Sequence, residues 1–241
     1  MKRDSFGSRF GALVAMAGSA VGLGNLWRFP YLVGENGGAA FIVVYIVLLF
    51  IICLPIFISE FVVGRRSQKN AFAAFRDLSG GTAWRWVGLI TVIVPLIVLS
   101  YYSVIGGWSI DYLLKSLSFS FTGGESQNAI NTMFTDLVTS TWTPLICLTA
   151  FLLATTLIVM VGIKDGIEKF SKVMMPLLFF IVIGIAVYSM TLPGAKAGLD
   201  YLFRPDFSKI DAKVCAAALG QAFFSLSIGF GTILTYASYV D

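Results

Sequence analysis

Long runs of apolar residues alternate with short polar segments along almost the whole chain. Six such runs are predicted, at residues 10–35, 38–63, 86–114, 143–162, 167–191 and 213–240. Each has about 20 residues or more, which is the length of helix that crosses the hydrocarbon core of a bilayer. The pattern therefore predicts an all-α integral membrane protein with six transmembrane helices.

Two of the six runs are interrupted by small and polar residues. The first contains Gly18-Ser-Ala-Val-Gly-Leu-Gly-Asn25 and then Arg28, and the sixth contains Ser225-Leu-Ser-Ile-Gly-Phe-Gly231. Lipid offers no partners to freed backbone groups or to an arginine, so such breaks belong around a protein-lined site. The spacing of Gly18 and Gly22 alone favours a helix-packing motif. The polar neighbours and the second break favour a transporter site, where interrupted helices come in pairs.

Composition and charge agree with a membrane protein. Hydrophobic residues make up 57% of the chain and charged residues 12%, against about 25% charged in soluble domains. One set of connecting segments holds most of the basic residues: Lys2, Arg3, Arg9, Arg65, Arg66, Lys69, Arg76, Arg85, Lys164, Lys169 and Lys172. The positive-inside rule predicts that these segments and both termini are cytoplasmic. We expect the protein to lie in the plasma membrane. Because the basic residues flank the spans, we expect no nucleic-acid partner.

The chain lacks histidine and has three cysteines. Without histidine it has no Ser-His-Asp triad and no imidazole metal ligand, and the glycine cluster follows no Walker pattern. An enzyme is therefore not expected. Cys53, Cys147 and Cys215 lie in or beside apolar runs, and their odd number fits packing residues better than disulfides or a zinc site.

Four segments resemble the neurotransmitter:sodium symporter family, in particular its bacterial LeuT-like amino-acid transporters. They are Gly22–Tyr31 (GLGNLWRFPY), Asn36–Phe41 (NGGAAF), Gly162–Pro176 (GIKDGIEKFSKVMMP) and Gly220–Tyr239 (GQAFFSLSIGFGTILTYASY). The resemblance implies a LeuT-like fold of two inverted five-helix repeats, with the first and sixth helices unwound mid-span. Residues 1–241 would be a single transmembrane domain, with the first repeat at 10–191 and the first helix of the second at 213–241.

By the same resemblance, the chain takes part in sodium-coupled symport of an amino acid by alternating access. Na+ is a hard cation that binds oxygen ligands. The family's first sodium site corresponds here to the carbonyls of Gly18 and Val21. The second corresponds to the Ala20 carbonyl, the Asn25 side-chain oxygen and Ser225.

The resemblance also implies a substrate site. The amides of Leu23 and Gly24 and the Tyr102 hydroxyl would bind the substrate carboxylate. The remaining substrate-binding residues are Ala20, Gly22, Val98, Phe224, Ser225, Ser227 and Phe230. Relatives that carry monoamines have an aspartate where this chain has Gly22, so an α-amino acid is expected, with an apolar or aromatic side chain. Without the family resemblance, ordinary helix packing would be an equal alternative for the apolar members. An interfacial pair remains the alternative for Tyr101 and Tyr102.

Arg28 and Phe224 match the family's outer gate, and Arg3 and Tyr239 match its inner gate. An arginine that snorkels to the outer interface is the alternative for Arg28. Glu60 belongs either to a buried polar network or to the membrane boundary.

The family has twelve spans, and this chain resembles the first six. We therefore expect an incomplete portion of a transporter, which does not transport alone. Its core would be completed by second-half helices or in a homodimer. Its expected partners are a small amino acid, sodium ions and the lipid bilayer. The alternative is a non-transporting membrane half-protein with an interaction or regulatory role.

Overall fold

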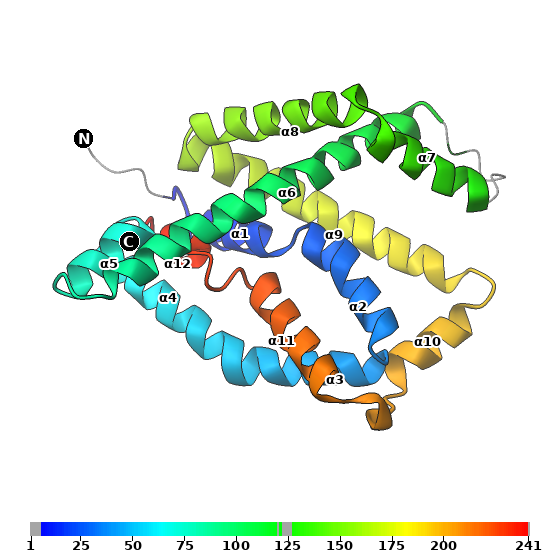
Figure 1. The fold of residues 1–241 in the computed structure, drawn as a ribbon, viewed down its shortest axis with the longest axis horizontal. Coiled ribbons are helices and arrows are strands. Elements are labelled where there is room, and N and C mark those ends of the chain that lie inside the picture. The colour runs from blue at the N-terminus through cyan, green and yellow to red at the C-terminus, as the bar shows by residue number, and fades with distance from the viewer. Residues whose placement is uncertain (1–5, 120, 122–126, 241) are drawn as a thin grey trace. The chain divides into compact units, whose positions relative to one another are not determined.

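The computed structural model describes residues 6–119, 121 and 127–240, which are helical with no strand among them (Figure 1). The chain divides into two compact units. Unit 1 comprises Met1–Val92 and Ile163–Asp241, and unit 2 comprises Ile93–Gly162. Each unit is described by itself.

Unit 1 begins with a bent helix. Helix α1 (Arg9–Ala20) is followed by the π-helical turn η1 (Gly24–Arg28) and by α2 (Phe29–Glu35). The two halves, Arg9–Ala20 and Gly24–Glu35, differ in direction by 52°. Ser8 caps the start of α1, because its hydroxyl accepts a hydrogen bond from the Gly11 amide at 3.0 Å.

The second predicted run is one helical span from Ala39 to Ser67. It consists of α3 (Ala39–Leu48), the π-helical turn η2 (Leu49–Cys53) and α4 (Leu54–Ser67). Pro55 lies in the first turn of α4 and has no amide hydrogen to donate, so the widened turn η2 accommodates the lost bond. Helix α5 (Ala71–Leu78) follows, with Asn70 as its N-cap.

The last part of unit 1 begins with the π-helical turn η3 (Ile163–Glu168), α9 (Lys169–Met190) and α10 (Ala195–Phe203). The 3₁₀ turn η4 (Phe207–Lys209), α11 (Ala212–Ser225) and α12 (Thr232–Ala237) complete it. Helix α11 packs on α3, and α12 packs on α4. The core between α3 and α11 is built around Phe41, which is fully buried against Val33, Val214 and Ala218.

Unit 2 holds most of α6 (Arg85–Leu117), together with α7 (Gln127–Thr139) and α8 (Trp142–Met160). Helices α6 and α8 approach closely at Gly107. A Cβ atom there would lie 2.7 Å from the backbone nitrogen of Leu148. Small residues allow such close helix contacts inside membranes.

The described residues contain four helices long and apolar enough to cross a membrane, and the bent pair around η1 makes up to a fifth. The sixth predicted run differs from a continuous span. It is divided into α11, of 14 residues, and α12, of 6 residues. Residues 226–231 between them are turns in which Ser227, Gly229 and Gly231 have positive φ, which no α-helix accommodates.

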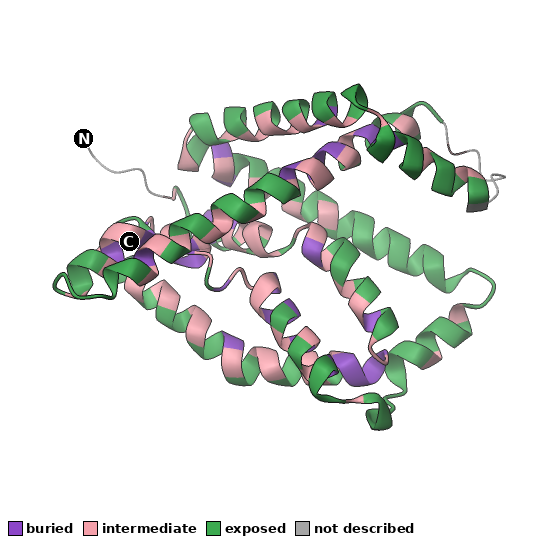
Figure 2. Cartoon of the chain, in the orientation of Figure 1, coloured by how far each residue is buried: buried purple, intermediate pink, exposed green. Residues whose placement is uncertain are grey.

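Exposed residues dominate α9, which has no buried residue, whereas buried residues gather on α3, α11 and α12 (Figure 2). An apolar helix with so little burial is typical of a surface that faces lipid or further protein.

The contact between α4 and α12 depends on Gly64. A Cβ atom at Gly64 would overlap the carbonyl oxygen of Leu234. We expect Gly64→Ala to lower the free energy of unfolding by about 1–3 kcal/mol, because the two helices must separate. Gly184→Ala is the matched control, since no heavy atom lies within 4 Å of a Cβ atom placed at that position. Thermal unfolding of both variants in detergent, followed by tryptophan fluorescence, tests this. Equal melting temperatures would contradict the close contact.

Candidate functional site

The two breaks meet in unit 1 through Asn25. Its side-chain nitrogen donates a hydrogen bond to the Ala20 carbonyl at 2.7 Å, which links the two ends of the first break. Its side-chain oxygen accepts a hydrogen bond from the Ser225 hydroxyl, also at 2.7 Å. Ser225 is the last residue of α11, where the second break begins. One amide therefore joins both ends of the first break to the start of the second.

Gln221 extends this network. Its side-chain nitrogen lies 3.2 Å from the Ser225 hydroxyl and 3.3 Å from the Gly24 carbonyl. The residue is fully buried, and its side-chain oxygen has no hydrogen-bond partner among the described residues. The sequence patterns did not single out Gln221. The available signal was a lone amide four residues before Ser225, which places both on one face of a helix.

The second break makes two further contacts. The Ser227 hydroxyl donates to the Ser19 carbonyl at 3.2 Å, near the end of α1. The Gly229 amide donates to the Glu60 carboxylate at 2.7 Å. Glu60 lies on α4. Because its carboxylate accepts a hydrogen bond from a backbone amide of the second break, Glu60 belongs to a polar network.

The residues of the first break differ in their surroundings. The Gly22 carbonyl accepts from the amides of Asn25 and Leu26, at 3.0 and 3.1 Å. On its other side Gly22 faces open space, because no heavy atom lies within 4 Å of a Cβ placed there. Leu23 is the N-cap of the turn η1 and Gly24 is its first residue, and amides at the start of a helix lack partners within the helix. Val21 is exposed, and a Cβ atom placed at Gly18 would lie 3.4 Å from the Met175 side chain.

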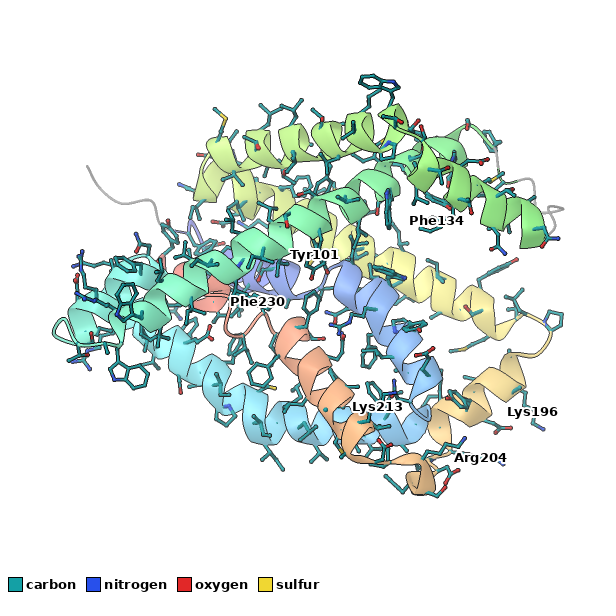
Figure 3. The ribbon with its side chains drawn as sticks, in the orientation of Figure 1. Tyr101, Phe134, Lys196, Arg204, Lys213 and Phe230 are labelled. Carbon is teal, nitrogen blue, oxygen red and sulfur yellow. The ribbon has the colours of Figure 1, made fainter. Side chains whose placement is uncertain are left out.

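The two predicted outer-gate residues are close together. The Arg28 guanidinium lies 5.4 Å from the centre of the Phe224 ring, a cation–π distance. The Phe224 ring meets the Phe230 ring edge-on, with centroids 6.1 Å apart. Phe230 is labelled in Figure 3, beside the turn that follows α11.

The predicted inner gate is described in part. The Tyr239 carbonyl accepts from the Phe6 amide at 3.4 Å, and the Phe6 and Tyr236 rings lie 6.1 Å apart. Arg3 lies outside the described residues. Its role in the inner gate stays a prediction.

Val98 and Tyr102 lie on α6 within unit 2, where Tyr101 and Tyr102 form an edge-on ring pair at 5.4 Å. Their roles in a substrate pocket stay predictions.

The oxygens at the contact of the two breaks suit a monovalent cation. They are the Ala20 carbonyl, the Asn25 side-chain oxygen and the Ser225 hydroxyl, all neutral. Among the described residues, no group of three His, Cys, Asp or Glu side chains is arranged to hold a metal ion. Divalent cations favour carboxylate-rich sites, whereas neutral oxygens suffice for alkali ions.

The sodium:neurotransmitter symporter family matches residues 3–136 and 126–241, which together span almost the whole chain. The chain belongs to this family. The family resemblance expected from the sequence is therefore confirmed. The expected all-α, LeuT-like fold class is confirmed by the likeness to the solved structure of MhsT, given below. The family consists of sodium-dependent transporters, which is not a class of enzymes.

Individual relatives agree with this membership. An uncharacterized sodium-dependent transporter of Bacillus subtilis, YhdH, is 39% identical over 99% of this chain and 53% of its own length. The human sodium-dependent neutral amino acid transporter SLC6A17 is 32% identical over 98% of this chain and 36% of its own.

Among solved structures, the crystal structure of MhsT in complex with L-phenylalanine superposes with a TM-score of 0.92 at 43% identity. The match covers 100% of this chain and 54% of MhsT. The chain thus spans about half the length of YhdH and of MhsT.

Ser225 provides a test of the network. We expect Ser225→Ala to destabilise the protein by about 1–3 kcal/mol, because it leaves the Asn25 oxygen and the Gln221 nitrogen without their shared partner. Ser225→Thr keeps a hydroxyl at the same carbon and serves as the control. Both melting temperatures are measured in sodium-free buffer. A loss of the same size in both variants would contradict a specific role for the hydroxyl.

Proposed function

We propose that this chain takes part in sodium-coupled symport of an amino acid across the plasma membrane, by alternating access and with both termini cytoplasmic. The observation that carries the proposal is the contact of the two breaks through Asn25 and Ser225. An ion bound at this contact would touch both halves of the site at once. Its presence would then decide how firmly the halves are held together.

For the second sodium position, the proposed ligands are the Ala20 carbonyl, the Asn25 side-chain oxygen and the Ser225 hydroxyl. The Asn25 nitrogen now faces the Ala20 carbonyl. Binding of Na+ by both oxygens requires the amide group to turn by about half a revolution, a cheap motion for a terminal amide. Gly18 and Val21 are the proposed carbonyl ligands of the other sodium.

For the substrate, the proposed site lies over Gly22. The open space beside Gly22 leaves room for the amino acid, and the amides of Leu23 and Gly24 would bind its carboxylate. Phe224 and Phe230 would contact an apolar or aromatic side chain. Two similarities support this class of cargo: SLC6A17 is named for neutral amino acids, and MhsT was solved with L-phenylalanine. Ser227 is a further proposed residue of this site.

Arg28 and Phe224 are the proposed outer gate. The Arg28 guanidinium over the Phe224 ring would cover the substrate when the gate is closed. Opening of the gate would move the guanidinium away from the ring. Tyr239 and Arg3 are the proposed inner gate.

Exposed apolar helices such as α9 and the half-length match to bacterial relatives support a chain that works with further helices. These would be second-half helices or a second copy of the chain. A membrane half-protein with an interaction or regulatory role is the alternative. Sodium-dependent binding without uptake by the 241-residue chain would support the need for further helices. Uptake by the purified chain alone would contradict that need.

Gly22 gives the sharpest test of the cargo. We expect Gly22→Asp to weaken sodium-dependent binding of phenylalanine or leucine by about tenfold or more, because a fixed carboxylate repels that of the substrate. Gly22→Ala adds a methyl group into the same open space and serves as the control. Binding of the labelled amino acids to purified protein is measured in sodium and in potassium. Equal loss in the two variants would contradict the carboxylate position, and sodium-independent binding would contradict symport.

A further inference from the structure

Glu168 is a buried carboxylate at the far end of α1 from the ion site. It is the last residue of η3, and its side chain is only 2% exposed. It binds the chain just before α1, about 160 residues away in sequence. We propose that Glu168 is a positioning residue for sodium binding. Its hydrogen bonds to Gly7 and Ser8, which we call the Glu168 clasp, fix the direction of α1. This inference rests on the proposed sodium site at Ala20.

The clasp uses both carboxylate oxygens. The Gly7 amide donates to one oxygen at 2.7 Å. The Ser8 hydroxyl and the Lys172 ammonium donate to the other, at 3.0 and 2.6 Å. A buried carboxylate is stable only when its oxygens are bonded and its charge is balanced, and here Lys172 supplies the balancing charge. The N-terminal segment is thus part of what makes burial of Glu168 tolerable.

Ser8 and Gly11 fit this arrangement closely. The Ser8 hydroxyl donates to Glu168 and also accepts from the Gly11 amide, so the clasp and the N-cap of α1 share one group. A Cβ atom at Gly11 would overlap the Glu168 carboxylate. Gly11 is therefore small because the carboxylate lies against its backbone. Glycine otherwise weakens a helix relative to alanine.

Helix α1 connects the clasp to the ion site. Its 12 residues span about 18 Å, with Ser8 before the first residue and Ala20 as the last. Val21 and Gly22 follow the end of the helix, and the next helical segment, Gly24–Glu35, differs from it in direction by 52°. A helix held at one end and hinged at the other transmits a small rotation to its carbonyls. Release of the clasp would therefore move the Ala20 carbonyl away from Asn25 and Ser225.

An exposed pair on the same turn provides a matched control. Asp165 and Lys169 are joined at 2.7 Å with the same spacing as Glu168 and Lys172, but their side chains are 58% and 70% exposed. Exposed pairs of this kind contribute little to stability. Asp165→Asn thus removes a carboxylate from η3 without touching the clasp.

The first measurement is amide hydrogen exchange of residues 7–12, in the full chain in lipid nanodiscs without substrate. We expect Glu168→Gln and Gly11→Ala each to speed exchange there by about tenfold, and Asp165→Asn to leave it unchanged. Gly11→Ala separates two explanations. Helix propensity alone would slow exchange, because alanine favours the helix, whereas loss of the clasp speeds it. Unchanged or slower exchange in Gly11→Ala together with unchanged exchange in Glu168→Gln would overturn the clasp.

The second measurement is the sodium concentration that half-saturates amino-acid binding. We expect Glu168→Gln to raise it by about fivefold or more, with Asp165→Asn equal to wild type. Faster exchange with an unchanged sodium requirement would overturn the positioning role and leave a purely structural contact. A wild-type protein that binds amino acids without sodium would contradict the proposed function, while hydrogen exchange would still decide the clasp.

Discussion

The side chain of Asn25 is the contact on which the rest of the site depends. It holds the Ala20 carbonyl at one end of the first break and the Ser225 hydroxyl at the start of the second. Interrupted helices leave backbone groups that lipid cannot satisfy, so they must be bonded within the protein. Asn25, Gln221 and Ser227 donate these bonds to the carbonyls of Ala20, Gly24 and Ser19. The same groups can exchange a protein partner for an ion at little cost.

Close packing of helices keeps the two breaks in register. Gly64 brings α4 against the backbone of Leu234 in α12, and Glu60 on the same helix holds the Gly229 amide. Helix α4 therefore supports both the turn after α11 and the helix that follows it. At the other end of α1, Glu168 binds Gly7 and Ser8. Contacts with α4 and with Glu168 thus hold the helices on either side of the breaks. The breaks themselves remain the segments that can change conformation.

Much of this was predictable from the sequence because its signals are local. Apolar runs predicted the membrane helices, and small and polar residues inside two runs predicted the breaks. The small and polar residues of the sixth run include Ser227, Gly229 and Gly231, whose positive φ divides the run into two helices. The family resemblance alone predicted that Asn25 and Ser225 belong to one sodium site.

Other features depended on tertiary contacts. Gln221 is one amide in an apolar helix, and its role emerges only when α11 lies against Gly24. The Glu168 clasp joins segments about 160 residues apart, and nothing in its tight charged turn distinguishes it from the exposed Asp165. Sequence patterns identify polar and charged residues within apolar helices. They do not reveal which distant residue satisfies the hydrogen bonds and charge of each one.

The central claim is that the two breaks form one sodium-dependent site through Asn25. The most direct test is the melting temperature of the purified wild-type chain and of Asn25→Ala as sodium replaces potassium at constant ionic strength. An ion that binds only the folded protein stabilises it in proportion to the logarithm of its concentration above Kd. The account predicts that sodium raises the melting temperature of the wild type and leaves that of Asn25→Ala unchanged. An equal rise in both proteins, or the same response to potassium, would contradict it.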